Sequence, residues 1–209
     1  MEPATPVAPE REPSRARPVV ARVLTVAIVA VSAAAFLLPE LGIVDALAKA
    51  NDRILAGEWW RLVTVALVHG GALHLAFNAF ALWQLGSLAE VLYGRGRFAA
   101  VFLLGTAAAT LASVAWTPGR AVGASGGVFA VVGALLVFGL RARGAVPDFA
   151  RRLVREMTWI VAINVLFGFT VQYVDNAAHL GGLAAGAALG AALGPAARFR
   201  RAGPRGRWS

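Results

Sequence analysis

The residues best suited to chemistry in this 209-residue chain are Ser125 and three histidines. Ser125 lies in the string Gly123-Ala124-Ser125-Gly126, which leads directly into the apolar run 128–140. A serine between glycines at a helix start can serve as a cap within a close helix contact. It can also be a nucleophile, because glycine exposes its hydroxyl and the helix N-terminus favours negative charge beside it. Taken alone, so short a motif favours the capping role.

A possible base for this serine is His179, which starts a second helical run. Glycine then recurs at every fourth residue, a spacing that lets another helix pack very closely. The run that begins at Ser125 is the expected partner, so Ser125 and His179 should meet across the contact. A neutral imidazole beside a serine hydroxyl activates it as a nucleophile. The small residues of the predicted contact are Gly182, Gly186, Gly190 and Gly194 on one helix and Gly126, Ala130 and Gly133 on the other.

Two other polar residues belong to the same stretch of the chain. Asp175 precedes His179 by four positions and could complete a Ser–His–Asp triad. We favour the simpler interpretation, in which Asp175 or Asn176 caps the helix. Asn164 is isolated in an apolar run, so we expect a packing hydrogen bond there.

The remaining histidines, His69 and His74, lie near Asn78. His74 and Asn78 are four residues apart and therefore share one helix face. They could form a hydrogen bond between helices, or a pair of N–H donors for an oxyanion. A metal site is a third, less favoured option, because only His69 and His74 are close in sequence and no helical carboxylate joins them.

Composition indicates how these residues are positioned. The chain is 58% hydrophobic and 15% charged, with a mean hydropathy of +0.67, which predicts an all-α integral membrane protein. With no cysteine, disulfides and thiolate metal sites are excluded. The net charge of +9 resides in tails and short loops, where it sets topology, so we expect no nucleic-acid partner. Six apolar runs are predicted to span the membrane, at roughly 19–38, 73–92, 98–116, 125–140, 157–173 and 176–193.

Three regions follow from this pattern. Residues 1–18 are predicted to be a disordered tail and not a signal peptide, residues 19–195 a six-helix membrane domain, and residues 196–209 a basic tail. Between the first two spans, residues 40–68 are too polar to cross the membrane. We interpret them as one or two short helices at the interface, with Trp59 and Trp60 at headgroup level. The alternative is an ordinary extramembrane loop with two anchoring tryptophans.

The distribution of basic residues predicts the orientation. Sixteen of the 20 lysines and arginines fall on the side that holds both tails. The other side has only Lys49, Arg53, Arg61 and Arg120. The positive-inside rule then places both termini in the cytoplasm. Ser125, His179 and the His69–Asn78 group all converge on the opposite half of the membrane.

In combination, these residues resemble the motifs of the rhomboid family of intramembrane serine proteases, over roughly residues 58–194. No single motif is specific, but all occur in the family's order on six predicted spans. They are Trp60-Arg61, His69, His74 with Asn78 (HxxxN), Glu90, Gly123-Ala124-Ser125-Gly126 (GxSG), and Ala178-His179 with Gly182 and Gly186 (AHxxGxxxG).

The resemblance implies a six-helix rhomboid bundle with an interfacial first loop and a water-filled cavity that opens outside the cytoplasm. Ser125 would be the nucleophile and His179 the general base, as a dyad without an acid. His74, Asn78 and the backbone N–H of Ser125 would form the oxyanion hole, with His69 in support. Implied substrates are single-pass transmembrane proteins in the lipid bilayer, cut near small residues without a cofactor or metal. The fifth helix and the loop 172–175 would admit them.

One position departs from the family pattern. Phe129 stands where well-studied members carry a tyrosine that stacks on the catalytic histidine. Stacking needs only the ring, so activity is expected to persist without the hydroxyl.

Other functions compete with the protease. A rhomboid-like pseudoprotease would bind membrane proteins without cutting them, but this chain keeps both Ser125 and His179. A small transporter predicts inverted repeats, and the halves show no self-similarity. The alanine- and arginine-rich composition suggests a bacterial plasma membrane. Since glycine stripes can pack helices within or between chains, the sequence leaves the oligomeric state open.

Overall fold

The computed structural model describes residues 17–143, 147–171 and 174–196. Most of the two predicted tails, 1–18 and 196–209, and part of the loop 172–175 therefore lie outside the described residues. In chain order the elements are α1 (Val20–Leu37), η1 (Pro39–Leu41), α2 (Ile43–Leu47), β1 (Lys49–Ala50), α3 (Asn51–Leu55), α4 (Arg61–Thr64), η2 (Val65–Leu67), α5 (Ala72–Ala81), the π-helical turn η3 (Leu82–Gly86), α6 (Ser87–Tyr93), α7 (Arg95–Trp116), β2 (Arg120–Ala121), α8 (Ser125–Ala142), α9 (Pro147–Thr170) and α10 (Asn176–Leu193).

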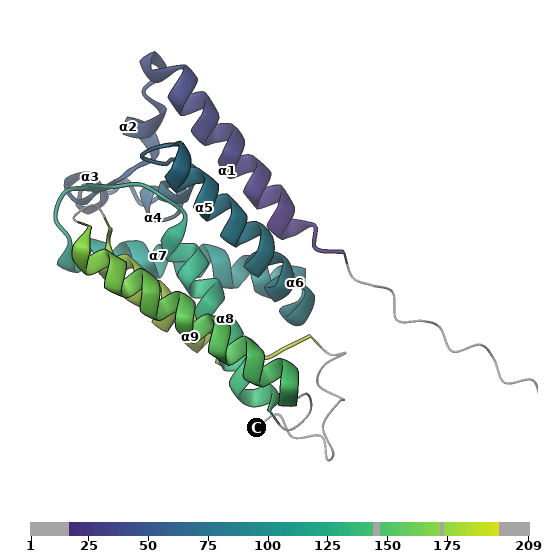
Figure 1. Cartoon of the computed structure of the whole chain (residues 1–209). Coiled ribbons are helices and arrows are strands. Elements are labelled where there is room, and N and C mark those ends of the chain that lie inside the picture. Colours follow the sequence, from purple (N-terminus) through teal and green to yellow (C-terminus); the bar gives the residue numbers. More distant parts are fainter. Residues whose placement is uncertain (1–16, 144–146, 172–173, 197–209) are drawn as a thin grey trace, which may run out of the picture.

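Long apolar helices dominate the described chain, and α1 and α5 lie side by side along one flank (Figure 1). Five stretches are long and apolar enough to cross a membrane: Val20–Leu37, Ala72–Tyr93, Arg95–Trp116, Ser125–Ala142 and Pro147–Thr170. The remaining predicted span corresponds to α10, which has 18 residues but consists largely of alanine and glycine around Asn176 and His179. The asparagine, the histidine and the glycines lower its mean hydropathy without adding any charged residue.

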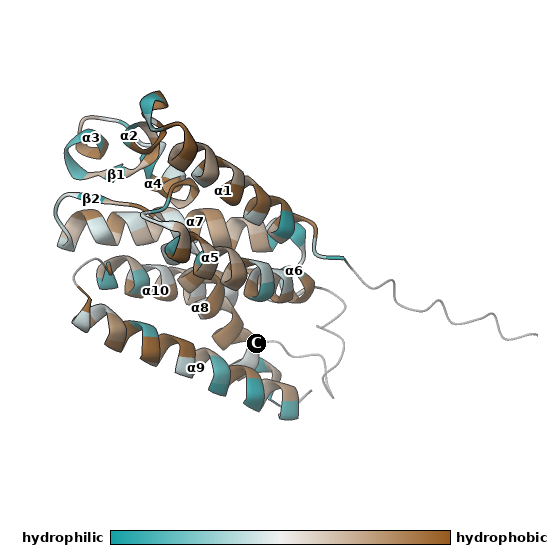
Figure 2. Ribbon diagram, turned by 45° about the horizontal axis from the view of Figure 1, so that its top comes forward, coloured by the Kyte–Doolittle hydropathy of each residue, from teal (hydrophilic) through white to brown (hydrophobic). Residues whose placement is uncertain are grey.

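Helix α9 extends beyond the predicted fifth span. The sequence predicts the span from about residue 157, whereas the helix begins ten residues earlier, at Pro147. Arginines interrupt the apolar run there, but the buried side chains of Ala150, Leu153 and Met157 continue along one helix face. Figure 2 shows the hydrophilic residues gathered at one end of α9.

The segment 40–68 is more broken than the predicted one or two short helices. It contains η1, α2, α3, α4 and η2, and β1 pairs antiparallel with β2 through Lys49–Ala121 and Ala50–Arg120. The chain is thus mostly helical and not strictly all-α. A buried guanidinium organises this irregular backbone: Arg61 donates to the carbonyl oxygens of Asp45 and Ala48 at 2.8 and 2.7 Å. Its pairing with Glu58 at 2.6 Å neutralises the buried charge.

Helix α8 is the centre of the bundle. Buried residues make up 72% of α8, against 11% of the apolar stretch of α9, whose outward side chains include Trp159 and Phe169. The predicted partnership of α8 with α10 is confirmed, because the glycine stripe brings the two backbones together. A Cβ added at Gly186 would lie 1.8 Å from the carbonyl oxygen of Ala130, and one at Gly133 would lie 2.2 Å from that of Leu183.

Glu90 ties α1 to the end of α6. Its buried carboxylate accepts hydrogen bonds from the backbone N–H groups of Val19, Val20 and Ala21 at 2.9, 3.1 and 2.8 Å. These donors have no partner within a helix, so the carboxylate caps α1 from a distance in sequence. The first span is thereby held against the second.

Candidate active site

Ser125 is the first residue of α8, directly after a tight turn at Gly123. Gly123 has φ +124°, a conformation that favours glycine, and its N–H donates to the carbonyl of Val65 at 3.0 Å. A Cβ at Gly123 would lie 2.7 Å from Cε1 of His74. The glycine therefore lets the imidazole of His74 lie against the backbone that leads into Ser125.

Gly126 provides close packing on the other side of Ser125. A Cβ there would lie 2.6 Å from the Cβ of Ala109 on α7. On α10, a Cβ at Gly182 would lie 2.2 Å from the carbonyl oxygen of Gly126. The first turn of α8, which carries Ser125, consequently packs against the second turn of α10, directly after the turn that carries His179.

His179 lies in the first turn of α10 and is 6% exposed. Its ring stacks on Phe129, with centroids 4.2 Å apart and planes inclined by 6°. The buried Nδ1 atom has no hydrogen-bond partner within the part of the chain that the structure describes. The phenyl ring thus fixes the plane of the imidazole, and no carboxylate binds its Nδ1 atom.

Asp175 is the N-cap of α10, as predicted. Its Oδ1 accepts hydrogen bonds from the N–H of Ala178 and the hydroxyl of Thr117, both at 3.0 Å. Its Oδ2 accepts a short hydrogen bond from the hydroxyl of Ser113. The carboxylate thereby joins α10 to the end of α7, and these donors account for most of its acceptor capacity.

His74 and Asn78 share one face of α5, with Asn78 7% exposed. The Asn78 amide donates one hydrogen bond to the carbonyl of His74 at 2.9 Å. An amide carries two donors, so one N–H of Asn78 remains for another acceptor.

His69 packs edge-on against His74, with ring centroids 5.0 Å apart. Its Nε2 accepts a hydrogen bond from the N–H of Ala124 at 3.3 Å, so the proton of the neutral ring is on Nδ1. Nδ1 then donates to the hydroxyl of Ser32 at 3.0 Å, and Ser32 donates to the carbonyl of Leu67 at 2.9 Å. Burial, with a smaller effect of His74, lowers the pKa of His69 from 6.5 to about 4.

Asn164, where we expected a packing hydrogen bond, is exposed and donates to the carbonyl of Ile160 one turn earlier on its own helix, at 2.8 Å. Among the residues described, no group of three or more His, Asp or Glu side chains could hold a metal ion.

Two contributors to the site were not predicted from the sequence. Ser32 was hidden among the apolar residues of the first span, although a serine there is a polar group that needs a partner. Lys49 is the only lysine of the chain, yet it is 1% exposed. Burial lowers its pKa, and the carboxylate of Asp175 acts in the opposite direction.

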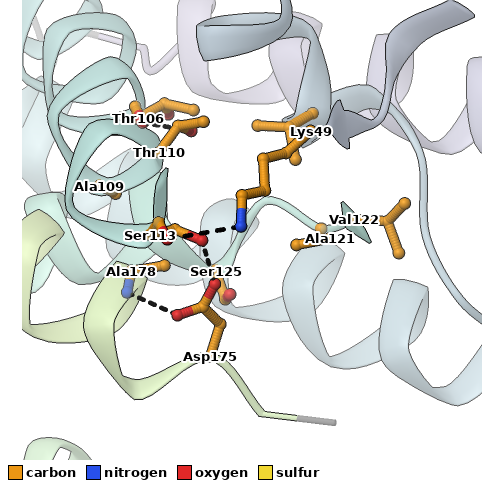
Figure 3. Close-up of a pocket in the computed structure, with 13 residues that line it drawn as sticks. Lys49, Thr106, Ala109, Thr110, Ser113, Ala121, Val122, Ser125, Asp175 and Ala178 are labelled. Atoms are coloured by element: carbon orange, nitrogen blue, oxygen red, sulfur yellow. Dashed lines mark hydrogen bonds between the residues drawn. The ribbon is translucent and has the colours of Figure 1, made fainter. Parts of the chain in front are cut away.

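Lys49 and Ser125 line one cavity of about 40 Å³, together with Ser113 and Asp175 (Figure 3). The Lys49 side chain reaches this cavity from β1 and donates to the carbonyl oxygens of Thr117 and Ser113 at 2.6 and 3.4 Å. The candidate nucleophile therefore borders a small polar space.

Fold, hydropathy and site together define an integral membrane protein in which a half-buried serine and a buried histidine lie in the first turns of two packed helices. The family profile described as Rhomboid domain matches residues 56–196, and the chain belongs to the rhomboid family. Rhomboid protease GluP from Bacillus subtilis (strain 168) is 42% identical over 139 residues, covering 66% of this chain and 27% of that protein.

Two further relatives show the same likeness. RHOMBOID-like protein 9, chloroplastic, from Arabidopsis thaliana is 42% identical over 90 residues, which cover 43% of this chain and 21% of that protein. Rhomboid protease AarA from Providencia stuartii is 28% identical over 160 residues, which cover 65% of this chain and 56% of that protein. The chain thus spans between about a fifth and just over half the length of these relatives.

Proposed function

We propose that this chain is a serine endopeptidase that hydrolyses peptide bonds in or near transmembrane segments, with Ser125 as nucleophile and His179 as general base. The observation that carries the proposal is the close packing of Gly182 against the Gly126 carbonyl, which brings the start of α8 next to the start of α10. The printed names of GluP and AarA, both rhomboid proteases, support the same activity.

In the proposed reaction, the hydroxyl of Ser125 attacks the peptide carbonyl and His179 accepts its proton. His179 then returns the proton to the leaving amine, and water hydrolyses the acyl-enzyme. The stack with Phe129 supports a fixed imidazole plane, and the unpartnered Nδ1 supports a dyad without an acid. Asp175 is occupied as a helix cap and is not part of this dyad.

The oxyanion would be stabilised by His74, by the free N–H of Asn78 and by the backbone N–H of Ser125. The close approach of His74 to Gly123 supports this role, because it brings an imidazole to the turn before the nucleophile. The N-terminus of α8 adds a favourable dipole for the developing negative charge.

In the membrane, we infer six spans including α10, with both tails in the cytoplasm and residues 40–68 at the interface. The exposed side chains of Trp59 and Trp60 support contact of this segment with headgroups. Residues 19–195 would be the catalytic membrane domain, in a bacterial plasma membrane. Its substrates would be single-pass transmembrane proteins that enter beside α9.

The test is labelling of purified protein in detergent with a fluorophosphonate probe. Wild type should label, Ser125→Ala should not, and His179→Ala should label at least about 100-fold more slowly. Thermal unfolding of each variant shows whether it remains folded. Folded wild type that stays unlabelled would contradict the proposal and favour a pseudoprotease.

A further inference from the structure

The cavity beside Ser125 contains an unused hydrogen-bond donor. A lysine ammonium has three N–H donors, and Lys49 uses two of them on the carbonyls of Thr117 and Ser113. No third acceptor lies within hydrogen-bond distance among the described residues. One N–H of a side chain that is 1% exposed is therefore left for whatever enters the cavity.

The same cavity also offers an acceptor. Oδ2 of Asp175 receives one hydrogen bond, from the hydroxyl of Ser113, and an ionised carboxylate oxygen can accept two. No ion pair of 4.0 Å or shorter joins Lys49 to Asp175. Figure 3 shows the two side chains approaching from different elements on either side of Ser113. A group that both accepts and donates a hydrogen bond would satisfy Lys49 and Asp175 at once.

The size of the cavity restricts that group. Its volume is about 40 Å³, and a water needs at least about 10–15 Å³ of such space. At most about three water-sized groups therefore fit, which corresponds to a few waters or to a very short side chain. Threonines and alanines form much of the remaining wall, including Thr106, Ala109 and Thr110.

We propose that Lys49 and Asp175 make this cavity a pocket for a short hydroxyl side chain of the substrate, so that cleavage beside serine is preferred to cleavage beside alanine. This inference rests on the proposed protease function. Water in the pocket would be displaced when substrate binds. A serine hydroxyl reproduces its hydrogen bonds, whereas an alanine methyl leaves Lys49 and Asp175 unpaired. Sites that hydrogen-bond a hydroxyl discriminate strongly against analogues without it.

The experiment compares two transmembrane model substrates that differ only in serine or alanine at the cleaved position. Full-length protein is reconstituted in liposomes, kcat/KM is measured for both, and the cut is mapped by mass spectrometry. Wild type should favour serine by about tenfold or more. Lys49→Met should bring the ratio close to one, mainly by slowing cleavage of the serine substrate.

Asn51→Ala is the matched control. Asn51 also donates to the Thr117 carbonyl, at 3.4 Å, but it does not line the cavity. Its substitution should leave the serine-to-alanine ratio as in wild type. If wild type cleaves both substrates equally, the proposed pocket is wrong but the protease function is unaffected. This comparison does not depend on the folding of any variant. An unchanged ratio in folded Lys49→Met would also overturn it. Cleavage of neither substrate by wild type would overturn the protease function itself.

Discussion

His69 is buried beside the candidate site, but the proposed reaction does not use it. Its two ring nitrogens connect Ser32 on α1 with the N–H of Ala124, the residue before the proposed nucleophile. The contact with Ala124 needs the neutral ring, since a protonated imidazole has no acceptor for that N–H, whereas Nδ1–H can donate to Ser32 in either state. His69 is therefore expected to brace the turn and to make its stability depend on pH.

We predict that acid weakens the fold through His69. The unfolded chain has the ordinary histidine pKa of about 6.5, whereas the folded protein has about 4, so the unfolded state binds the proton more readily between these values. The free energy of unfolding should fall as pH drops from 6.5 to 4, by about 3 kcal/mol in total. In thermal unfolding this corresponds to a loss of roughly 6–12 °C.

The comparison variant is His69→Gln. It should be less stable than wild type at pH 7, because Gln fits the two contacts poorly. Its melting temperature should also fall less than that of wild type between pH 6.5 and 4. Parallel curves for the two proteins would show that His69 does not carry the effect.

At the scale of elements, the contact of α8 with α10 is the one most easily disrupted by a substitution that adds a single methyl group. A Cβ at Gly186 would meet the carbonyl oxygen, carbonyl carbon and Cα of Ala130 at 1.8, 2.4 and 2.4 Å. All three are backbone atoms, so no side chain can rotate to make room. The two helices would have to separate.

We predict that Gly186→Ala destabilises the protein by about 3 kcal/mol or more. Because the shift would move His179 away from Ser125, fluorophosphonate labelling should fall further than stability explains. Ala188→Val is the control, since Ala188 lies exposed on the same helix. A Gly186→Ala protein that melts and labels like wild type would rule out this close contact.

The glycine stripe also illustrates what the sequence could predict. Small residues at a four-residue spacing are a local pattern, and this pattern identified the right partner helix. The prediction that Asp175 caps α10 rested on an equally local pattern. By contrast, Arg61 organises 40–68 through carbonyls of Asp45 and Ala48, which no local pattern reveals. The role of Lys49 depends on Thr117, far away in the chain, so spacing alone could not place it in the cavity.

At the scale of the whole molecule, the number of spans follows from hydropathy only where a helix is clearly apolar. Five stretches meet that condition, while α10 carries Asn176 and His179 among alanine and glycine. Its close contact with α8 supports our proposal that α10 is the sixth span. The orientation in the membrane depends on the charged loops. Their basic residues are distributed unequally between the two sides, which predicts which side is cytoplasmic.

The chain offers a direct test of orientation, because it has no native cysteine. Single cysteines can be placed at exposed positions in two loops, as Pro118→Cys before β2 and Arg143→Cys after α8. With both termini in the cytoplasm, a membrane-impermeant maleimide should label Pro118→Cys in intact cells. Arg143→Cys should react only after the membrane is permeabilised.

The reverse labelling pattern would place Ser125 at the cytoplasmic face. It would then contradict the positive-inside argument, although the contact of α8 with α10 would be unaffected. Labelling of both positions in intact cells would instead mean that α8 does not cross the bilayer. Because Ser125 begins α8 and Arg143 follows its end, this pair of cysteines also determines from which side a substrate would reach the proposed nucleophile.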